Sequence, residues 1–176
     1  MKKIKHLILF YISLILFSLI LKSCCGYSSK IVGNGRMFIT QVDNGRSDTL
    51  RGEFRIQLFL ERQMSCNISN NGFINSANAT SCSEIAENTL NRETLKLICE
   101  NDFNYKGTII KAGTNFANED NLIIDFDDFF GLIEIQLSKE FLKDAKFSNG
   151  YHKFKVEIET SDNGKFENEA SSYLEI

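Results

Sequence analysis

Hydrophobic and polar residues alternate with a period of two along much of the chain. In residues 51–62, for example, Phe54, Ile56 and Leu58 share one side of an extended backbone, and charged or polar residues occupy the other. Such alternation is typical of antiparallel strands with one buried and one solvated face. The pattern predicts strands in the ranges 37–42, 51–62, 93–100, 131–138, 152–160 and 165–176.

Turn and cap residues separate these ranges. The segments "DNG" (43–45) and "SDNGK" (161–165) predict hairpin turns, because Asn and Gly tolerate the positive φ that such turns require. Serines that precede short apolar patterns predict two short helices, at 81–90 and 138–145. About seven strands in about 150 residues predict an all-β fold, an antiparallel immunoglobulin-like β-sandwich with a disulfide-stapled loop, over residues 36–176.

The first residues have the pattern of an export signal. Lys2, Lys3 and Lys5 make a cationic start, and residues 7–21 form a mainly apolar run. Fifteen helical residues span only about 22 Å. A helix that spans a bilayer needs roughly 20 residues, so this run is too short. We therefore expect a removed signal peptide over residues 1–23. A retained transmembrane anchor is the alternative.

The segment "LKSC" that follows the apolar run resembles a bacterial lipobox. Leu21 is the large aliphatic residue three positions before the cysteine, and Ser23 is the small residue directly before it. The resemblance implies that Cys24 carries the lipid and becomes the N-terminus of the mature protein. Residues 24–35 would then form a short membrane-proximal linker. The alternative is ordinary cleavage that leaves Cys24 free or in a disulfide.

Loss of the signal peptide changes the charge of the chain. Residues 1–23 contain four of the 20 basic residues and none of the 23 acidic ones. The mature chain would therefore have 16 basic and 23 acidic residues, a formal net charge of −7. Nucleic acid is excluded as a partner, because phosphate binding requires a concentrated basic face. We expect an envelope protein, lipid-anchored in the outer membrane and facing the periplasm, because no acidic run follows Cys24 as a surface-export signal.

The remaining cysteines are expected to meet an oxidising compartment, where disulfides form. Cys25, Cys66, Cys82 and Cys99 allow three connectivities. We favour the pair Cys66–Cys82, because it closes the polar segment between them, at a gain of about 3 kcal/mol in the chain-entropy model. The pair Cys66–Cys99 is the rival. Cys99 shares a strand face with Leu97, however, so it would alternatively be a buried residue without a disulfide.

Catalytic motifs are not evident after the signal peptide. His152 is the one histidine of this part, and we expect it to be a solvent-exposed residue on a polar strand face. The sequence has no GxSxG elbow, no CxxC or HExxH spacing and no glycine-rich phosphate loop. We therefore expect no enzyme and no cofactor.

An acidic stretch, "NEDNLIIDFDDFFG" at 118–131, is the most distinctive cluster. Asp125 and Asp127 would share one strand face, and Asp128 would follow at the turn. Carboxylates at this spacing are a weak Ca²⁺ candidate, because Ca²⁺ requires 6–8 oxygen ligands and no EF-hand spacing is present. A solvated acidic loop is the alternative, and we expect no metal.

The phenylalanines of the same stretch have two interpretations. Phe129 and Phe130, together with the three aspartates, would form an aromatic and acidic surface suited to a peptide or a glycan. Alternatively, these rings close the end of the hydrophobic core.

Four segments of the chain occur in an order that resembles a known family. They are "SCCG" at 23–26, "INSANATSC" at 74–82, "LKLICENDFN" at 95–104 and "YHKFKVEIETSDNGKF" at 151–166. They are similar to an uncharacterised family of Bacteroidetes lipoproteins, a domain of unknown function with an SCCG lipobox and an NSAxAxSC segment. The resemblance implies an envelope address and a sandwich-like fold, and it implies no activity.

Two classes of function follow from these features. The first is a lipid-anchored, non-catalytic binding or structural module, attached to the membrane through its N-terminal lipid and contacting an envelope protein or a glycan. The alternative is a lipid-anchored periplasmic hydrolase that uses His152 or the cluster of Asp125, Asp127 and Asp128.

Overall fold

A computed structural model describes residues 12–13, 26–42, 49–67, 85–128 and 130–175. The chain divides into two compact units. The first unit comprises residues 1–29 and 64–87, and the second comprises residues 30–63 and 88–176. Among the described residues, no helix is long and apolar enough to span a membrane.

The described part of the first unit is a small area of parallel strand pairing. Strand β1 (Gly26–Gln41) begins here, and Ser28 and Ser29 pair with the two residues of β4 (Ile85–Ala86). The hydroxyls of Ser28 and Ser65 lie 2.6 Å apart. Main-chain pairing of this kind does not depend on hydrophobic alternation, which is why the sequence pattern did not reveal it.

The second unit contains one sheet in which β1, β3 (Phe54–Asn67), β9 (Leu132–Leu137) and β8 (Leu122–Asp127) lie in that order. Strands β3, β9 and β8 are antiparallel neighbours. Every second residue is buried in β9, and also in β3 from Phe54 to Leu60, as the period of two predicted.

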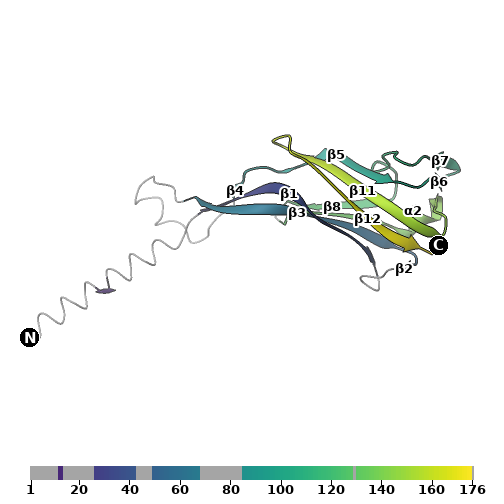
Figure 1. The fold of residues 1–176 in the computed structure, drawn as a ribbon, viewed down its shortest axis with the longest axis horizontal. Helices are drawn as coiled ribbons and strands as arrows, with labels where there is room; N and C mark the ends of the chain where they lie inside the picture. Colours follow the sequence, from purple (N-terminus) through teal and green to yellow (C-terminus); the bar gives the residue numbers. More distant parts are fainter. Residues whose placement is uncertain (1–11, 14–25, 43–48, 68–84, 129, 176) are drawn as a thin grey trace, which may run out of the picture. The chain divides into compact units, whose positions relative to one another are not determined.

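The second sheet of this unit has the order β2 (Thr49–Leu50), β12 (Lys165–Leu174), β11 (Gly150–Thr160) and β5 (Leu90–Cys99) (Figure 1). The hairpin β11–β12 is paired in continuous register, and it closes in the predicted turn at 161–165. Asn163 has a φ of 64° there, which explains why the turn uses Asn.

Inward side chains of the two sheets pack against each other. The rings of Phe54 on β3 and Phe154 on β11 lie 5.7 Å apart, and neither is exposed to solvent. Burial of a large apolar side chain contributes about 1.5–3 kcal/mol. The core therefore lies between the sheets, and its largest fully buried members include Ile56, Leu58, Leu97, Ile133, Ile135 and Leu137.

A third, small sheet and one short helix complete the second unit. The sheet has the order β10 (Ala145–Lys146), β6 (Phe103–Tyr105) and β7 (Thr108–Ile110). Helix α2 (Lys139–Asp144) begins after Ser138, whose hydroxyl accepts a hydrogen bond from the Phe141 amide. The ring of Tyr105 in this sheet stacks on the ring of Phe141 in the helix. The ring of Phe103 stacks on that of Phe147, which directly follows β10.

Asn88 connects three parts of the second unit. Its side chain accepts a hydrogen bond from the Ile31 amide and donates one to the Ile31 carbonyl, and it donates another to Asp162 in the β11–β12 turn. Hydrogen bonds from Thr160, Lys30 and Asn88 hold the pKa of Asp162 well below its ordinary value. Because the pKa of Asp162 is lowered in the folded chain, the stability that these bonds contribute is lost only as the pH falls through that lowered value.

Several sequence predictions can now be assessed. Strands dominate the described residues, which confirms the all-β class, and helix 138–145 is confirmed. The helix at 81–90 is wrong for its described part, because residues 85–86 and 90 are in strands. Residues 26–35 are also strand rather than linker, and Ile31 within them is buried. The turn at 43–45 lies outside the described residues.

Candidate functional site

The acidic stretch forms strand β8 and the turn that follows it. Asp125 and Asp127 share one face of β8, as predicted. Their carboxylates accept hydrogen bonds from nearby amides: Asp125 from Phe126 at 2.9 Å, and Asp127 from Phe130 at 3.1 Å. Bonds of this kind are typical of aspartates that shape a turn.

Asp128 has a different role from its two neighbours. Its carboxylate accepts a hydrogen bond from the Leu90 amide at 3.3 Å and lies 3.6 Å from the Arg92 guanidinium. Arg92 in turn lies over the ring of Phe126, at 5.1 Å. Asp128 therefore connects the β8–β9 turn to the start of β5. No group of three or more metal-ligating side chains exists among the described residues, so the structure gives the Ca²⁺ candidate no support.

The phenylalanines of this stretch are not equivalent. Phe130 is 63% exposed, whereas Phe126 packs against the hydrophobic core. Phe129 lies outside the described residues. The peptide- or glycan-binding surface at Asp125, Asp127, Asp128, Phe129 and Phe130 stays a prediction.

His152 is buried, so the prediction of a solvent-exposed histidine is wrong. Only 1% of its surface is exposed. The reason is its parity on β11: His152 shares a face with Phe154, Val156 and Ile158, all of which are in the core. Its ring meets Phe147 edge-on at 5.4 Å.

The Cys99 thiol is the hydrogen-bonding neighbour of His152 inside the core. Cys99 Sγ lies 3.8 Å from His152 Nδ1, and His152 Nε2 lies 2.8 Å from the Ser148 carbonyl oxygen. A carbonyl oxygen can only accept, so Nε2 donates to Ser148; in the tautomer that carries its proton on Nε2, Nδ1 accepts from the thiol. Both ring nitrogens of this buried histidine are thereby satisfied.

The thiol in this contact stays protonated at neutral pH. Burial raises the pKa of Cys99 from its ordinary value of 9.0 to about 11, opposed in part by a hydrogen bond from the Asn101 backbone and assisted by the charge of Glu100. A nucleophilic cysteine requires the thiolate and access to solvent. The Cys99–His152 contact has neither, and its chemistry is that of a neutral, structural hydrogen bond.

The cysteine predictions have different outcomes. Cys99 is a free, buried thiol, as its strand parity indicated, and the rival disulfide Cys66–Cys99 is therefore not present. Cys66 belongs to β3, and Cys24 and Cys82 lie outside the described residues. The disulfide Cys66–Cys82 and the lipidation of Cys24 stay predictions.

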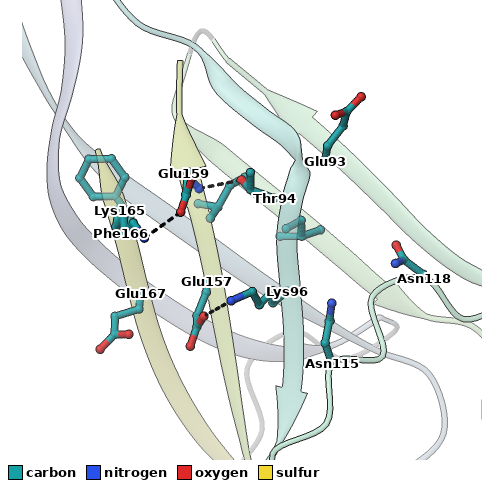
Figure 2. Close-up of a pocket in the computed structure, with 12 residues that line it drawn as sticks. Glu93, Thr94, Lys96, Asn115, Asn118, Glu157, Glu159, Lys165, Phe166 and Glu167 are labelled. Carbon is teal, nitrogen blue, oxygen red and sulfur yellow. Dashed lines mark hydrogen bonds and ion pairs between the residues drawn. The ribbon is translucent and has the colours of Figure 1, made fainter. Parts of the chain in front are cut away.

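A groove on the second sheet is a candidate site that the sequence did not indicate. It begins where β5 loses register with β11 (Figure 2). Lys96 pairs with Glu157, and Asn91 pairs with Glu159. Four residues of β5 (92–95) therefore lie opposite a single residue of β11, Ile158. Extra residues on one strand form a bulge, which redirects side chains and often lies next to a functional site.

The Thr94 hydroxyl replaces part of the main-chain hydrogen bonding that this bulge interrupts. It accepts a hydrogen bond from the Glu159 amide at 2.9 Å and donates one to the Asn91 carbonyl at 2.7 Å. The result is a hollow of about 400 Å³. This volume is within the range of about 300–1,000 Å³ that is usual for ligand sites.

Charged side chains form the rim of the groove, which we call the β5 groove. Lys96 contacts Glu157 at 3.1 Å, and Lys165 contacts Glu159 at 3.1 Å. Figure 2 shows these pairs on one side of β5, with Asn115 and Asn118 on the other. The remaining lining residues are Glu93, Thr94, Leu95, Ile158, Phe166 and Glu167.

Two polar side chains of the β5 groove have no partner within the described part of the chain. The side chains of Glu93 and Asn118 form no hydrogen bond or ion pair there. By contrast, Glu157 and Glu167 also contact Lys155 beside the groove, at 2.8 Å and 2.9 Å. These contacts hold the pKa of Glu157 below its ordinary value, chiefly through the hydrogen bond from Lys155. Glu93 is thus the one carboxylate of the described lining that no cation neutralises.

Comparisons with known proteins complete the description of the chain. No protein-family model and no curated protein matches it. Solved structures that are similar to it include the C-terminal domain of the AgI/II polypeptide BspA of Streptococcus agalactiae, at 10% identity and a TM-score of 0.26, over 78% of this chain and 49% of that one. The C-terminal domain of the Streptococcus pyogenes antigen I/II-family protein AspA has 12% identity and a TM-score of 0.27, over 81% and 46%.

The chain therefore spans less than half the length of these two structures. TM-scores of this size do not establish a shared fold.

Proposed function

We propose that this chain is a lipid-anchored protein of the bacterial cell envelope whose body is a non-catalytic binding or structural module. The body would be an immunoglobulin-like β-sandwich, attached through Cys24 to the outer membrane and facing the periplasm. The lipobox-like segment that ends in Ser23 and Cys24 supports the anchor. The two sheets with Phe54 and Phe154 between them support the sandwich.

The observation that carries the non-catalytic part is the burial of His152. Its ring is 1% exposed and both of its nitrogens have partners. A general base must lie within hydrogen-bond reach of a substrate proton, and this ring is not accessible to one. The aspartates of the acidic stretch bond to backbone amides or to Arg92. We therefore prefer the binding module to the hydrolase alternative.

An envelope protein or a glycan remains the proposed partner of this module. The β5 groove is the place for such a contact, because it combines a hollow with polar groups that have no internal partner. Other side chains on the outward face of this sheet form ion pairs between its own strands, such as Lys153 with Glu169 at 2.6 Å. Exposed pairs of this kind contribute about 0–1 kcal/mol each and leave the surface hydrated.

Lipid attachment can be tested by growing bacteria that express the full chain with a fatty acid that carries a detectable tag. We expect the tag on the unchanged chain and on the Cys25→Ser variant, and none on the Cys24→Ser variant. Cys25 is the matched control because it is the adjacent thiol. Tag that remains on Cys24→Ser, or its absence from the unchanged chain, would contradict the anchor.

A further inference from the structure

The β5 groove has a lining of two chemical kinds. Leu95, Ile158 and Phe166 are apolar and almost fully buried. Four glutamates and two lysines lie among the polar lining residues, so acidic groups exceed basic ones. A ligand that matches this lining has an apolar stem and a positively charged end.

Lysine and arginine side chains have this combination. Their methylene stems cover apolar surface while the charged head stays at the polar rim. The other common ligand classes match the groove less well: a phosphate or carboxylate would meet the excess of acidic groups, and a purely apolar group would leave the polar rim unsatisfied.

Glu93 is the group in the groove that is best placed to receive such a cation. It lines the hollow, lies on the bulge of β5 and has no ion-pair partner among the described residues. The amide of Asn118, also without a partner there, offers a carbonyl oxygen on the same side of β5 (Figure 2). The other acidic residues of the lining are held by Lys96, Lys155 or Lys165 and define the rim.

We propose that the β5 groove binds a lysine or arginine side chain presented by a partner protein, with Glu93 as the main contact of its charged head. The inference deepens the proposed function and rests on it, since it names the partner chemistry of the binding module. The predicted charge of −7 on the body favours the same encounter, because a net acidic surface attracts basic segments at low ionic strength.

The test uses the full chain, purified from cells in a non-ionic detergent, and fluorescently labelled hexalysine, hexaarginine and hexaglutamate peptides. Fluorescence anisotropy measures binding at low and at physiological ionic strength. We expect the two basic peptides to bind and hexaglutamate not to bind. The Glu93→Gln variant should bind the basic peptides about fivefold more weakly, which is the effect of one exposed charge contact.

Glu140→Gln is the matched control. Glu140 is an exposed glutamate on α2, outside the groove and without an ion-pair partner among the described residues, so its replacement removes the same charge from the body. Equal weakening by Glu93→Gln and Glu140→Gln would indicate diffuse attraction to an acidic protein and would overturn the proposal. The absence of binding by either basic peptide would also overturn it.

Failure of the groove and failure of the proposed function give different results. If hexalysine does not bind while the fatty-acid tag still depends on Cys24, only the groove proposal falls. If the tag is absent and hexalysine binding still depends on Glu93, the anchor falls and the groove remains.

Discussion

Replacing His152 by alanine should lower the free energy of unfolding by about 3 kcal/mol. The change removes a fully buried ring that contacts Phe147 and leaves a cavity in its place. It also leaves the Ser148 carbonyl and the Cys99 thiol without their hydrogen-bond partner. A buried polar group without a partner costs about 1–3 kcal/mol, and the cavity adds to this loss.

The measurement is urea unfolding of the full chain in a non-ionic detergent, followed by circular dichroism because the chain has no tryptophan. Tyr151→Ala is the matched control: Tyr151 precedes His152 on β11, but it lies on the outer face and is 74% exposed. We expect this control to lose no more than about 1 kcal/mol. A loss as small for His152→Ala would show that the imidazole is not a core group.

Alkaline pH should destabilise the protein through Cys99. The folded-state pKa of this thiol is raised from 9.0 to about 11, so between these values the unfolded chain loses the proton while the folded chain keeps it. The unfolded state then binds fewer protons, and stability falls as pH rises through this window. A difference of about two pH units corresponds to at most about 3 kcal/mol.

Other groups also titrate in this range, so the Cys99→Ala variant serves as the reference. We expect the variant to be less stable than the unchanged chain at neutral pH, because it loses the thiol beside His152. The difference should shrink between about pH 9 and pH 11, as the unchanged chain loses the contribution of the protonated thiol. Parallel stability curves over this window would mean that the thiol is not shielded by burial.

The strands that the sequence revealed are those in which side chains decide the burial. Leu95 and Leu97 on β5, and Ile133 and Ile135 on β9, alternate with polar residues over enough positions to define a period. The first ten residues of β1 contain few apolar residues apart from Ile31 and Val32, so the same pattern could not identify them as strand. The strands of the third sheet contain two or three residues, which is too short for a period.

The candidate sites were harder to predict because they depend on contacts between distant segments. His152 has the same parity as Phe154 on β11, which is consistent with its burial, but the prediction relied on residue type and gave a solvent-exposed histidine. The β5 groove depends on a loss of register with β11, which only the paired strands can show. Nothing in the run around Glu93 distinguishes this glutamate from any other exposed one.

Lipid attachment at Cys24 is tested most directly by the intact mass of the full-length gene product purified from bacterial membranes. We predict a species that begins at Cys24 and carries the additional mass of a lipid on that residue. A species that retains residues 1–23 with an unmodified Cys24 would contradict the anchor, the envelope location and the role that depends on them.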